Sequence, residues 1–297
     1  LFGWMARRSS KERPRLITTW YGVELRWVQS SLPWLRWFVR WALRISDTIV
    51  AISSYTAREI ARFANTQVVV IPYTLPFTEG EPKTRLPSAG GFKVLFVGRL
   101  VERKGVMHLI DAVGQMPAEL RAGLVVIADG PERQTLEARA RDSGLKGAVE
   151  FRGRVSDDEL RATYARSDVL VLPSILDARG DTEGLGVVLL EAMSYGVPVV
   201  ASDIGGITDI VEHDKSGLLV PPGDVAQLAR ALERLARDPA LARRLGSAGE
   251  QRVRQAFGWP EIMAKWDAVY RGAPARTRTD TASGAGSAAT PPRAPAR

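Results

Sequence analysis

Two basic side chains follow one apolar segment of the chain at a short interval. In the run KVLFVGRLVERKG, residues 93–105, the apolar residues predict a buried strand that ends at Gly98, and Arg99 and Lys104 lie in the loop after it. In a parallel α/β sheet, ligands bind beyond the carboxyl ends of the strands. A guanidinium and an ammonium group beside a helix N-terminus suit a diphosphate. A solvated basic loop that binds nothing fits the same residues.

Two carboxylates lie further along the chain at a helical spacing. Glu183 precedes a Gly-Leu-Gly turn, and Glu191 lies two turns inside the helix that this turn opens. The step between them spans about 12 Å of helix axis. The glycines let backbone N–H groups approach a ligand, and the helix dipole favours phosphate there. A diphosphate at this point would have a sugar near Glu183 and a ribose near Glu191; the alternative is a helix cap and a paired surface charge.

Short apolar runs that alternate with helical patterns must position these side chains. The runs are continuous in Val, Ile and Leu, as in strands buried on both faces, and strands alternating with helices predict parallel βαβ units in a doubly wound sheet. The expected strands are Leu16–Thr19, Thr48–Ile52, Val68–Ile71, Lys93–Val97, Leu124–Ala128, Val149–Phe151, Val169–Leu172, Val197–Ala201 and Leu218–Val220. The expected helices include Val106–Met116, Arg133–Asp142, Asp157–Arg166 and Val187–Tyr195.

Composition divides these strands into two series. The segment Thr74–Gly91 is rich in Pro, Gly and charge, which predicts an interdomain linker at 81–91. The series at 92–257 has six strands and predicts a complete Rossmann-like domain. The series at 1–80 offers only about three strands, so we expect the remnant of a second domain.

The overall composition bounds the kinds of site that the chain can form. It has no cysteine, which fits a reducing compartment and excludes disulfides, and only two histidines, which disfavours a histidine-rich metal site. No apolar run reaches the length of a membrane span, and the net charge of +8 fits several anionic partners. Residues 272–297 lack periodicity and are expected to be disordered. Because the chain begins at Leu1, we expect it to be a piece of a longer protein.

Six ordered motifs together resemble a known family. They are GRLVERKG (98–105), ADGPER (128–133), FRGRVSDDEL (151–160), SDVLVLPS (167–174), EGLGVVLLEAMSYGVPVVAS (183–202) and GLLVPPGD (217–224). This series resembles the retaining GT-B glycosyltransferases of family 4, which include bacterial mannosyl- and glucosyltransferases. The resemblance implies an α/β fold of GT-B type with two Rossmann-like domains, the N-terminal one incomplete here. It also implies that 258–271 is a closing helix that crosses back to the N-domain.

The same resemblance implies a reaction and the residues that serve it. The reaction is transfer of a hexose from a UDP- or GDP-linked donor to a glycan or lipid-linked acceptor, with retention of configuration. Arg99 and Lys104 match the pair that binds the donor diphosphate. Glu183 matches the acid that contacts the transferred sugar, and Glu191 the acid that contacts the ribose. The other donor-binding positions that match are Gly98, Gly130, Pro131, Arg152, Gly184, Leu185, Gly186 and Val187.

Two mechanistic alternatives follow from these assignments. Glu183 could act as a covalent nucleophile, as in retaining glycosidases, but we favour a role in orienting and stabilising the sugar. A D-x-D motif that would bind Mn²⁺ or Mg²⁺ is absent from the chain, and Asp181-Thr182-Glu183 is its nearest approach. We therefore expect no metal and no cofactor, because the nucleotide sugar is itself a substrate.

The acceptor side has a partial match in TTWYGVEL, residues 18–25. Gly22 and Glu24 agree with the family's loop, whereas Tyr21 stands where a histidine is usual. This departure keeps two other functions open: an inactive nucleotide-sugar-binding module that serves a partner subunit, and a GT-B nucleotide-sugar epimerase. Nucleic-acid binding is disfavoured, because no helix-turn-helix, RNP or zinc-finger pattern accompanies the charge.

The segment 27–45 has an unusual pattern. Trp34, Trp37, Phe38, Trp41 and Ile45 form one helical stripe, with Trp27 just before it, and Arg36, Arg40 and Arg44 form a second stripe. Two interpretations fit: a helix lying on an anionic membrane surface, and a helix packed on the N-domain sheet with its arginines in solvent. The expected location is accordingly the cytoplasm, including the inner face of the cell membrane.

Overall fold

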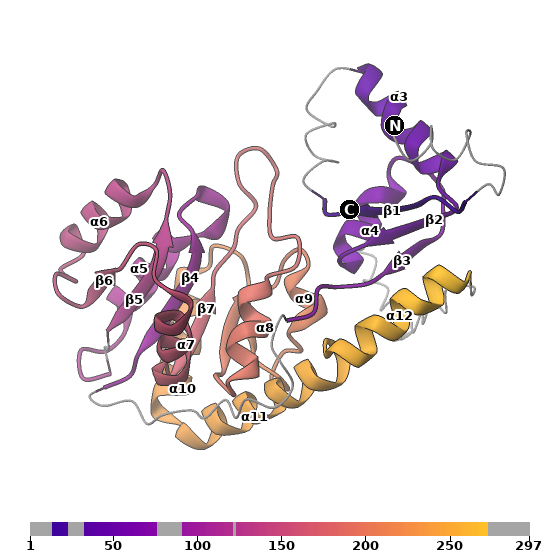
Figure 1. Ribbon diagram of the computed structural model, residues 1–297. Helices are drawn as coiled ribbons and strands as arrows, with labels where there is room; N and C mark the ends of the chain where they lie inside the picture. The colour runs from indigo at the N-terminus through magenta and orange to yellow at the C-terminus, as the bar shows by residue number, and fades with distance from the viewer. Residues whose placement is uncertain (1–13, 23–32, 76–90, 121–122, 273–297) are drawn as a thin grey trace, which may run out of the picture.

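The computed structural model describes residues 14–22, 33–75, 91–120 and 123–272. Two α/β units are visible, each built around a parallel sheet (Figure 1). The larger sheet has the order β6-β5-β4-β7-β8-β9. Its strands are β4 (Val94–Arg99), β5 (Leu124–Asp129), β6 (Val149–Phe151), β7 (Val169–Leu172), β8 (Val199–Ser202) and β9 (Leu218–Val220). These strands are buried because their apolar runs are covered on both faces, and Leu170 and Val171 are wholly inaccessible.

The strand order reverses at the centre of this sheet. From β4 the chain moves outward through β5 and β6, and then returns to the other side of β4 to form β7. Such a switch point leaves a crevice beyond the carboxyl ends of the two central strands. The loops that follow β4 and β7 are therefore the places where a ligand site is expected.

Helices cover this sheet in two groups. The helices α5, α6 and α10 pack side by side, while α8 packs beside α11. Several begin at a side-chain cap: Ser156 accepts from the backbone N–H of Glu159 at the start of α7, and Asp224 accepts from that of Gln227 at the start of α10. The helices are α5 (Val106–Gln115), α6 (Arg133–Asp142), α7 (Asp157–Arg166), α8 (Val187–Ser194), α9 (Ile207–Ile210), α10 (Val225–Arg237), α11 (Pro239–Ala256) and α12 (Trp259–Arg271), with a 3₁₀ turn, η1 (Glu102–Lys104).

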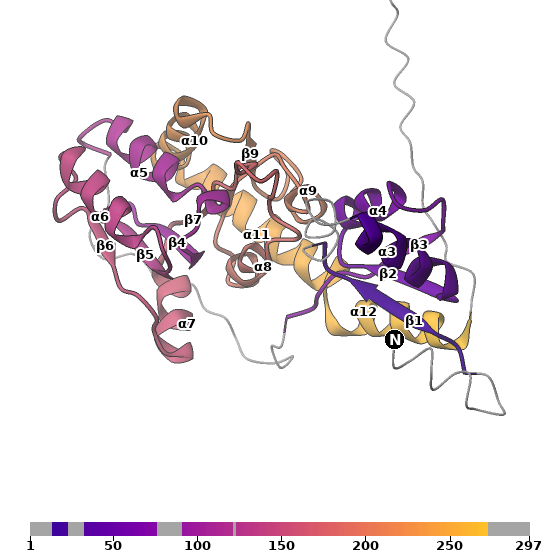
Figure 2. The ribbon, with the colours of Figure 1, turned by 90° about the horizontal axis from the view of Figure 1, so that it is seen from above.

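The smaller unit contains the parallel strands β1 (Ile17–Trp20), β2 (Thr48–Ala51) and β3 (Val68–Val70), in that order. Two helices, α3 (Pro33–Ile45) and α4 (Ser54–Ala61), belong to it. The helix α12 extends from the larger unit along this sheet (Figures 1 and 2), where Ile262 and Val269 pack against Val50 of β2. One long segment of the C-terminal chain thereby joins the two units.

A polar contact also joins the two units. The backbone N–H and the hydroxyl of Ser54, at the start of α4, donate to the carboxylate of Asp209 in α9, with a backbone N to Oδ2 distance of 2.5 Å. An acidic side chain at a helix N-terminus is favourable because of the exposed amides and the dipole there.

The helix α3 packs on the smaller sheet through a face that Trp37 does not share. Leu35, Val39, Ala42 and Leu43 contact the cluster that contains Trp20 and Ile49. In contrast, Trp37 is 68% exposed, and the three arginines of the second stripe are also exposed. The expected segment 27–45 includes residues outside the structure's description, namely 27–32 and the side chain of Trp34. Within the rest, the packed stripe is aliphatic and Trp37 faces outward.

Candidate functional site

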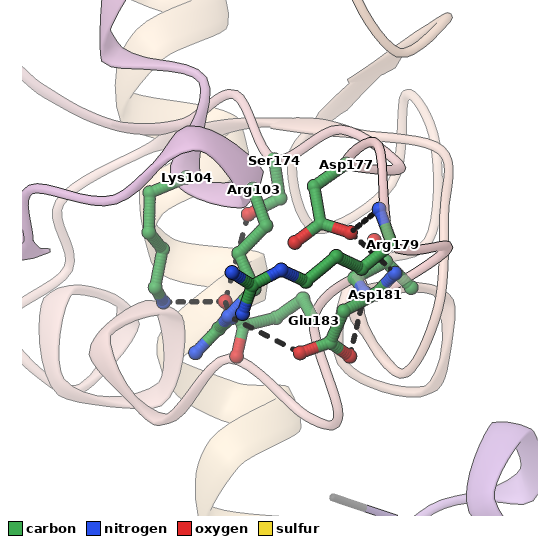
Figure 3. Close-up of polar contacts among 8 residues, drawn as sticks. Arg103, Lys104, Ser174, Asp177, Arg179, Asp181 and Glu183 are labelled. Carbon is green, nitrogen blue, oxygen red and sulfur yellow. Dashed lines mark hydrogen bonds and ion pairs between the residues drawn. The ribbon is translucent and has the colours of Figure 1, made fainter. Parts of the chain in front are cut away.

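The centre of the candidate site is an ion pair between Lys104 and Glu183. The Lys104 ammonium, at the end of η1, donates to Oε2 of Glu183, and each side chain is only about one-tenth exposed (Figure 3). Arg103 Nη1 lies 3.5 Å from the same oxygen, and the hydroxyl of Ser174 donates to it at 3.5 Å. A buried charge is tolerated when it is paired in this way. A carboxylate and two cations therefore lie together at the end of the sheet.

A closed loop holds Glu183 in place. Oδ1 of Asp177 accepts from the backbone N–H groups of Arg179 (3.0 Å) and Asp181 (2.7 Å), as Figure 3 shows. Oδ1 of Asp181 accepts from the N–H of Thr182 at 2.9 Å. Asp side chains that bond nearby backbone groups stabilise turns in this manner. The loop after β7 is thus shaped by its own acidic side chains, one of which also lies 3.7 Å from Arg103.

Backbone-to-backbone packing joins the loops around the site. A Cβ at Gly105 would lie 2.0 Å from the carbonyl oxygen of Pro173, and a Cβ at Gly206 would lie 2.0 Å from that of Gly184. Only glycine permits such approaches. The N–H of Gly206 also donates to the carbonyl of Glu183 at 2.9 Å. Through these contacts the loops after β4, β7 and β8 pack directly against one another, and this packing sets the position of Glu183 relative to Lys104.

The helix α8 presents its N-terminus to the same place. Gly186 precedes its first residue in a left-handed conformation (φ 94°), and no described side chain caps the helix. The first N–H groups of a helix have no intrahelical partner, so they and the helix dipole favour an anion. Residues 184–187 provide these groups.

A cavity of about 310 Å³ lies between the two units at this point. Its wall on the larger unit consists of Arg103, Lys104 and residues 181–188. Its wall on the smaller unit consists of Tyr21, Gly22, Ile52, Tyr55 and Tyr73. The cavity thus brings the expected donor-side residues Glu183, Lys104 and 184–187 opposite the expected acceptor-side residues Tyr21 and Gly22. Glu24 lies outside the described residues.

The carboxylate of Glu191 accepts a hydrogen bond from the buried side chain of Tyr164. The hydroxyl of Tyr164, in α7, donates to Oε2 of Glu191 at 2.6 Å, and the Tyr164 ring stacks on Tyr195 with 5.7 Å between centroids. Burial, and then the charge of Glu191, raise the pKa of Tyr164 well above its ordinary value. The phenol therefore remains a hydrogen-bond donor at neutral pH.

The remaining expected donor-side residues lie at some remove from the cavity. Arg99 is exposed at the end of β4 and falls outside the described lining, whereas Gly98, just before it, borders Lys104. Gly130, followed by Pro131, is packed closely on the Leu100 backbone, where a Cβ would lie 2.3 Å from the carbonyl oxygen. Packing within the protein therefore accounts for glycine at positions 98 and 130, and no ligand contact is needed to explain these two residues.

Arg152 faces a different groove. Its Nε and Nη2 donate to the two carboxylate oxygens of Glu150, each at 2.9 Å, and these bonds lower the pKa of Glu150. The groove, of about 520 Å³, lies between α7 and the β5–β6 side of the sheet and is lined also by Lys93 and Arg166. The structure therefore does not bring Arg152 to Glu183.

Three residues at or behind the site were missed by sequence reasoning. Arg103 adjoins Lys104, but a 3₁₀ turn rather than an ordinary loop is needed for both to line the cavity. Tyr73 lies between β3 and the Pro- and Gly-rich segment that begins at Thr74, and Tyr164 looks like an ordinary core residue of a helix. A signal existed only for Arg103, as a second cation in the same motif.

Two features, a metal-binding cluster and a membrane-spanning helix, are absent from the described residues. No three His, Asp or Glu side chains gather there as they would around a metal ion. Likewise, none of the described helices combines the length and the apolar character needed to cross a membrane.

The fold and the site define a class of protein: two α/β units of GT-B type with an anion-favouring helix end at the cavity between them. Comparison with known families agrees. The family description "Glycosyl transferases group 1" matches residues 79–252, and "Glycosyltransferase Family 4" matches residues 1–74. The chain belongs to the group 1 glycosyl transferases.

Individual relatives are consistent with this membership. The GDP-mannose-dependent alpha-(1-6)-phosphatidylinositol monomannoside mannosyltransferase of Mycobacterium tuberculosis is 33% identical over 87% of this chain and 70% of its own length. The 2-deoxystreptamine glucosyltransferase of Streptomyces kanamyceticus is 34% identical over 74% of this chain and 59% of its own length. Sucrose-phosphate synthase from Thermosynechococcus elongatus has a similar structure, with a TM-score of 0.74, 27% identity, and coverage of 91% of this chain and 70% of that one. The first of these relatives is named for its dependence on GDP-mannose, and the second is named as a glucosyltransferase.

Proposed function

We propose that the chain transfers a hexose from a UDP- or GDP-linked donor to a glycan or lipid-linked acceptor with retention of configuration. The observation that carries this proposal is the Lys104–Glu183 pair beside the N-terminus of α8. A diphosphate seated there would join Glu183 as a counter-ion of Lys104 and would receive the amides of α8. The relatives named GDP-mannose-dependent mannosyltransferase and glucosyltransferase support a hexose donor.

The arrangement suits departure of a nucleoside diphosphate. In the proposed reaction the bond from the anomeric carbon to the diphosphate oxygen breaks, and a bond to the acceptor oxygen forms on the same face. The acceptor proton passes to the departing diphosphate. Negative charge grows on the leaving group during this step, and Lys104, Arg103 and the α8 dipole are the groups that would stabilise it.

Glu183 is better suited to orient the sugar than to attack it. Its Oε2 is already engaged by Lys104, Arg103 and Ser174, so its electron density is shared among three donors. A charge-assisted pair of this kind makes a fixed acceptor for sugar hydroxyls but a weak nucleophile. Mass spectrometry of the chain after incubation with a fluorinated donor tests this role: the intact mass should be unchanged, and a glycosyl adduct on Glu183 would refute it.

The donor site can be tested by calorimetry. We expect UDP or GDP, and the matching glucose or mannose conjugate, to bind the chain at about micromolar affinity. Lys104→Ala should abolish the binding, because it removes the ammonium next to the diphosphate. Lys146→Ala, at an exposed position outside the cavity lining, is the matched control and should bind normally. Binding unaffected by Lys104→Ala would contradict the proposed site.

Transfer is proposed to proceed without a bound metal. The side chains around Glu183 include two cations, which can balance the diphosphate charge that a divalent ion balances in other enzymes. We expect donor binding and turnover to survive EDTA. A loss of turnover that Mg²⁺ or Mn²⁺ restores would overturn this part of the proposal.

We further propose that α3 holds the protein against the inner face of an anionic membrane. Trp37 and Phe38 are 68% and 40% exposed, and exposed arginines accompany them on the same helix. Aromatic rings beside arginines suit the interface of an anionic bilayer. The structure has an aliphatic face packing α3 on the sheet, which leaves these rings available.

Vesicle binding tests the membrane proposal. Trp37→Ala with Phe38→Ala should remove binding to phosphatidylglycerol vesicles in a sedimentation assay, and phosphatidylcholine vesicles should bind weakly. Trp259→Ala, which removes a 56% exposed tryptophan from α12, is the matched control. Unchanged binding of the α3 variant would exclude this surface.

A further inference from the structure

One wall of the cavity is made of tyrosines. Tyr21 follows β1 and Tyr73 follows β3, and their rings stack with 5.9 Å between centroids and 16° between planes. Both remain well exposed, at 46% and 41%, although each lines the cavity. Tyr55, near the start of α4, lines the same wall. If the stacked pair served only to stabilise the strand ends, we would expect other side chains to bury both rings.

This wall differs in charge from the one opposite. Its described residues are Tyr21, Gly22, Ile52, Tyr55 and Tyr73, none of which carries a charge at neutral pH. The opposite wall holds Arg103, Lys104, Asp181 and Glu183. A phosphate or carboxylate placed on the tyrosine wall would lose water without gaining a cation there, which is costly. A neutral group with both C–H faces and hydroxyls would gain contact with the rings and hydrogen bonds from the phenols.

The tyrosine wall lies directly against the loop of Glu183. A Cβ at Gly184 would lie 3.3 Å from the carbonyl oxygen of Tyr21 and 3.6 Å from Cδ1 of Ile52. A group resting on the Tyr21–Tyr73 pair is therefore next to the place where a donor sugar would contact Glu183. Such a group would be the part of the acceptor that carries the attacking hydroxyl.

From these observations we infer that the stacked Tyr21–Tyr73 pair is a subsite for a neutral polyhydroxylated ring of the acceptor, a sugar or a cyclitol. The inference rests on the proposed transferase function and narrows its acceptor. The ring stacks on the exposed aromatic faces of these two side chains. Acceptors whose reacting end is acidic or acyclic are disfavoured.

Ligand-observed saturation-transfer NMR on the full chain tests this subsite. The probes are methyl α-mannopyranoside, methyl α-glucopyranoside and myo-inositol as neutral rings, and L-malate as an acidic acyclic compound, each with and without UDP or GDP. We expect saturation of ring C–H protons for at least one neutral ring and none for malate. Tyr21→Leu and Tyr73→Leu should each weaken the ring's binding about threefold to tenfold, the usual worth of an aromatic contact.

Control variants separate stacking from general damage. Tyr21→Phe and Tyr73→Phe keep the ring and should keep most of the signal. Tyr270→Leu removes another exposed tyrosine, 66% exposed and stacked on Trp266 of α12, and should change nothing. Nucleotide affinity should be equal in all of these variants.

The outcomes distinguish this inference from the proposed function. Binding of malate in preference to all three rings, ring binding unchanged by both Leu variants, or no ring binding at all would overturn the subsite. An equal loss of nucleotide and ring binding would also overturn it, since it would indicate a structural role. Absence of UDP and GDP binding to the unmodified chain, with ring binding retained, would instead refute the donor site and leave the ring subsite standing.

Discussion

Replacing Tyr164 by phenylalanine removes the hydrogen bond that its hydroxyl donates to the carboxylate of Glu191 and leaves the ring stack on Tyr195 in place. The bond is short, at 2.6 Å, and its acceptor is charged. Hydrogen bonds to charged groups contribute about 1.5–3 kcal/mol. Because Glu191 is only partly buried, water replaces some of the lost interaction, and we expect a loss at the lower end, about 1.5 kcal/mol at pH 7. Urea unfolding of Tyr164→Phe and the unmodified chain measures this difference, with Tyr270→Phe as the control.

The difference should depend on pH in a defined direction. The pKa of Tyr164 is raised in the folded chain, chiefly by burial and then by Glu191. The stability linked to this proton is fully present below the unfolded pKa of about 10 and is lost above it, by up to about 1.4 kcal/mol per pH unit. The difference in free energy of unfolding between the unmodified chain and Tyr164→Phe should therefore stay constant from pH 7 to about pH 10 and become smaller at higher pH. No difference in free energy of unfolding at pH 7, or a difference that increases above pH 10, would refute the reasoning.

Three further predictions concern the loops, the two units and metal. Gly206→Ala places a methyl group 2.0 Å from the carbonyl oxygen of Gly184, so thermal unfolding should show a free energy of unfolding lower by about 1–3 kcal/mol, and nucleotide binding should weaken. Gly123→Ala, at a position with open space around it, is the control and should change neither quantity. Ser54→Ala removes a hydroxyl that donates to Asp209, so small-angle scattering should show a larger radius of gyration; an unchanged radius would mean that this contact does not hold the units together. Addition of EDTA should leave calorimetric donor binding unaltered, and weaker binding after chelation would contradict metal independence.

Most strands could be predicted because their sequences are continuous apolar runs. Val169–Leu172 and Leu218–Val220 are found with the expected bounds, and the parallel order follows from the alternation with helices. Several other strands, such as Ile17–Trp20 and Val94–Arg99, are shifted from the expected bounds at an end, and the run from Val197 becomes a strand only at Val199. The N–H of Val197 is bonded to the carbonyl of Ala192 at the end of α8, and Pro198 has no N–H to donate to the sheet.

The meeting of Lys104 and Glu183 could also be anticipated, although 79 residues separate them. Both follow strands at the reversal of the sheet, where chain segments converge. The direction of individual side chains could not be predicted in the same way. Arg103, in the 3₁₀ turn, lines the cavity, whereas Arg99, exposed at the end of β4, does not. Arg152 pairs instead with Glu150, beside it at the edge strand.

The α3 segment shows how a correct period can still leave the buried face undetermined. The helical spacing of the tryptophans and arginines was visible in the sequence, and it fitted both a packed and an interfacial helix. The structure adds that Leu35, Val39 and Leu43 form the packed face and that Trp37 is exposed.

The most direct test of the central claim is to follow a bound donor by proton and phosphorus NMR. The chain is incubated with UDP-α-glucose or GDP-α-mannose, whichever binds, and with a neutral sugar acceptor or water alone. The account predicts release of the nucleoside diphosphate and a first-formed product with the α configuration, both absent in Lys104→Ala. A β product would contradict retention, and a donor that binds but stays intact would make the chain a binding module rather than a transferase.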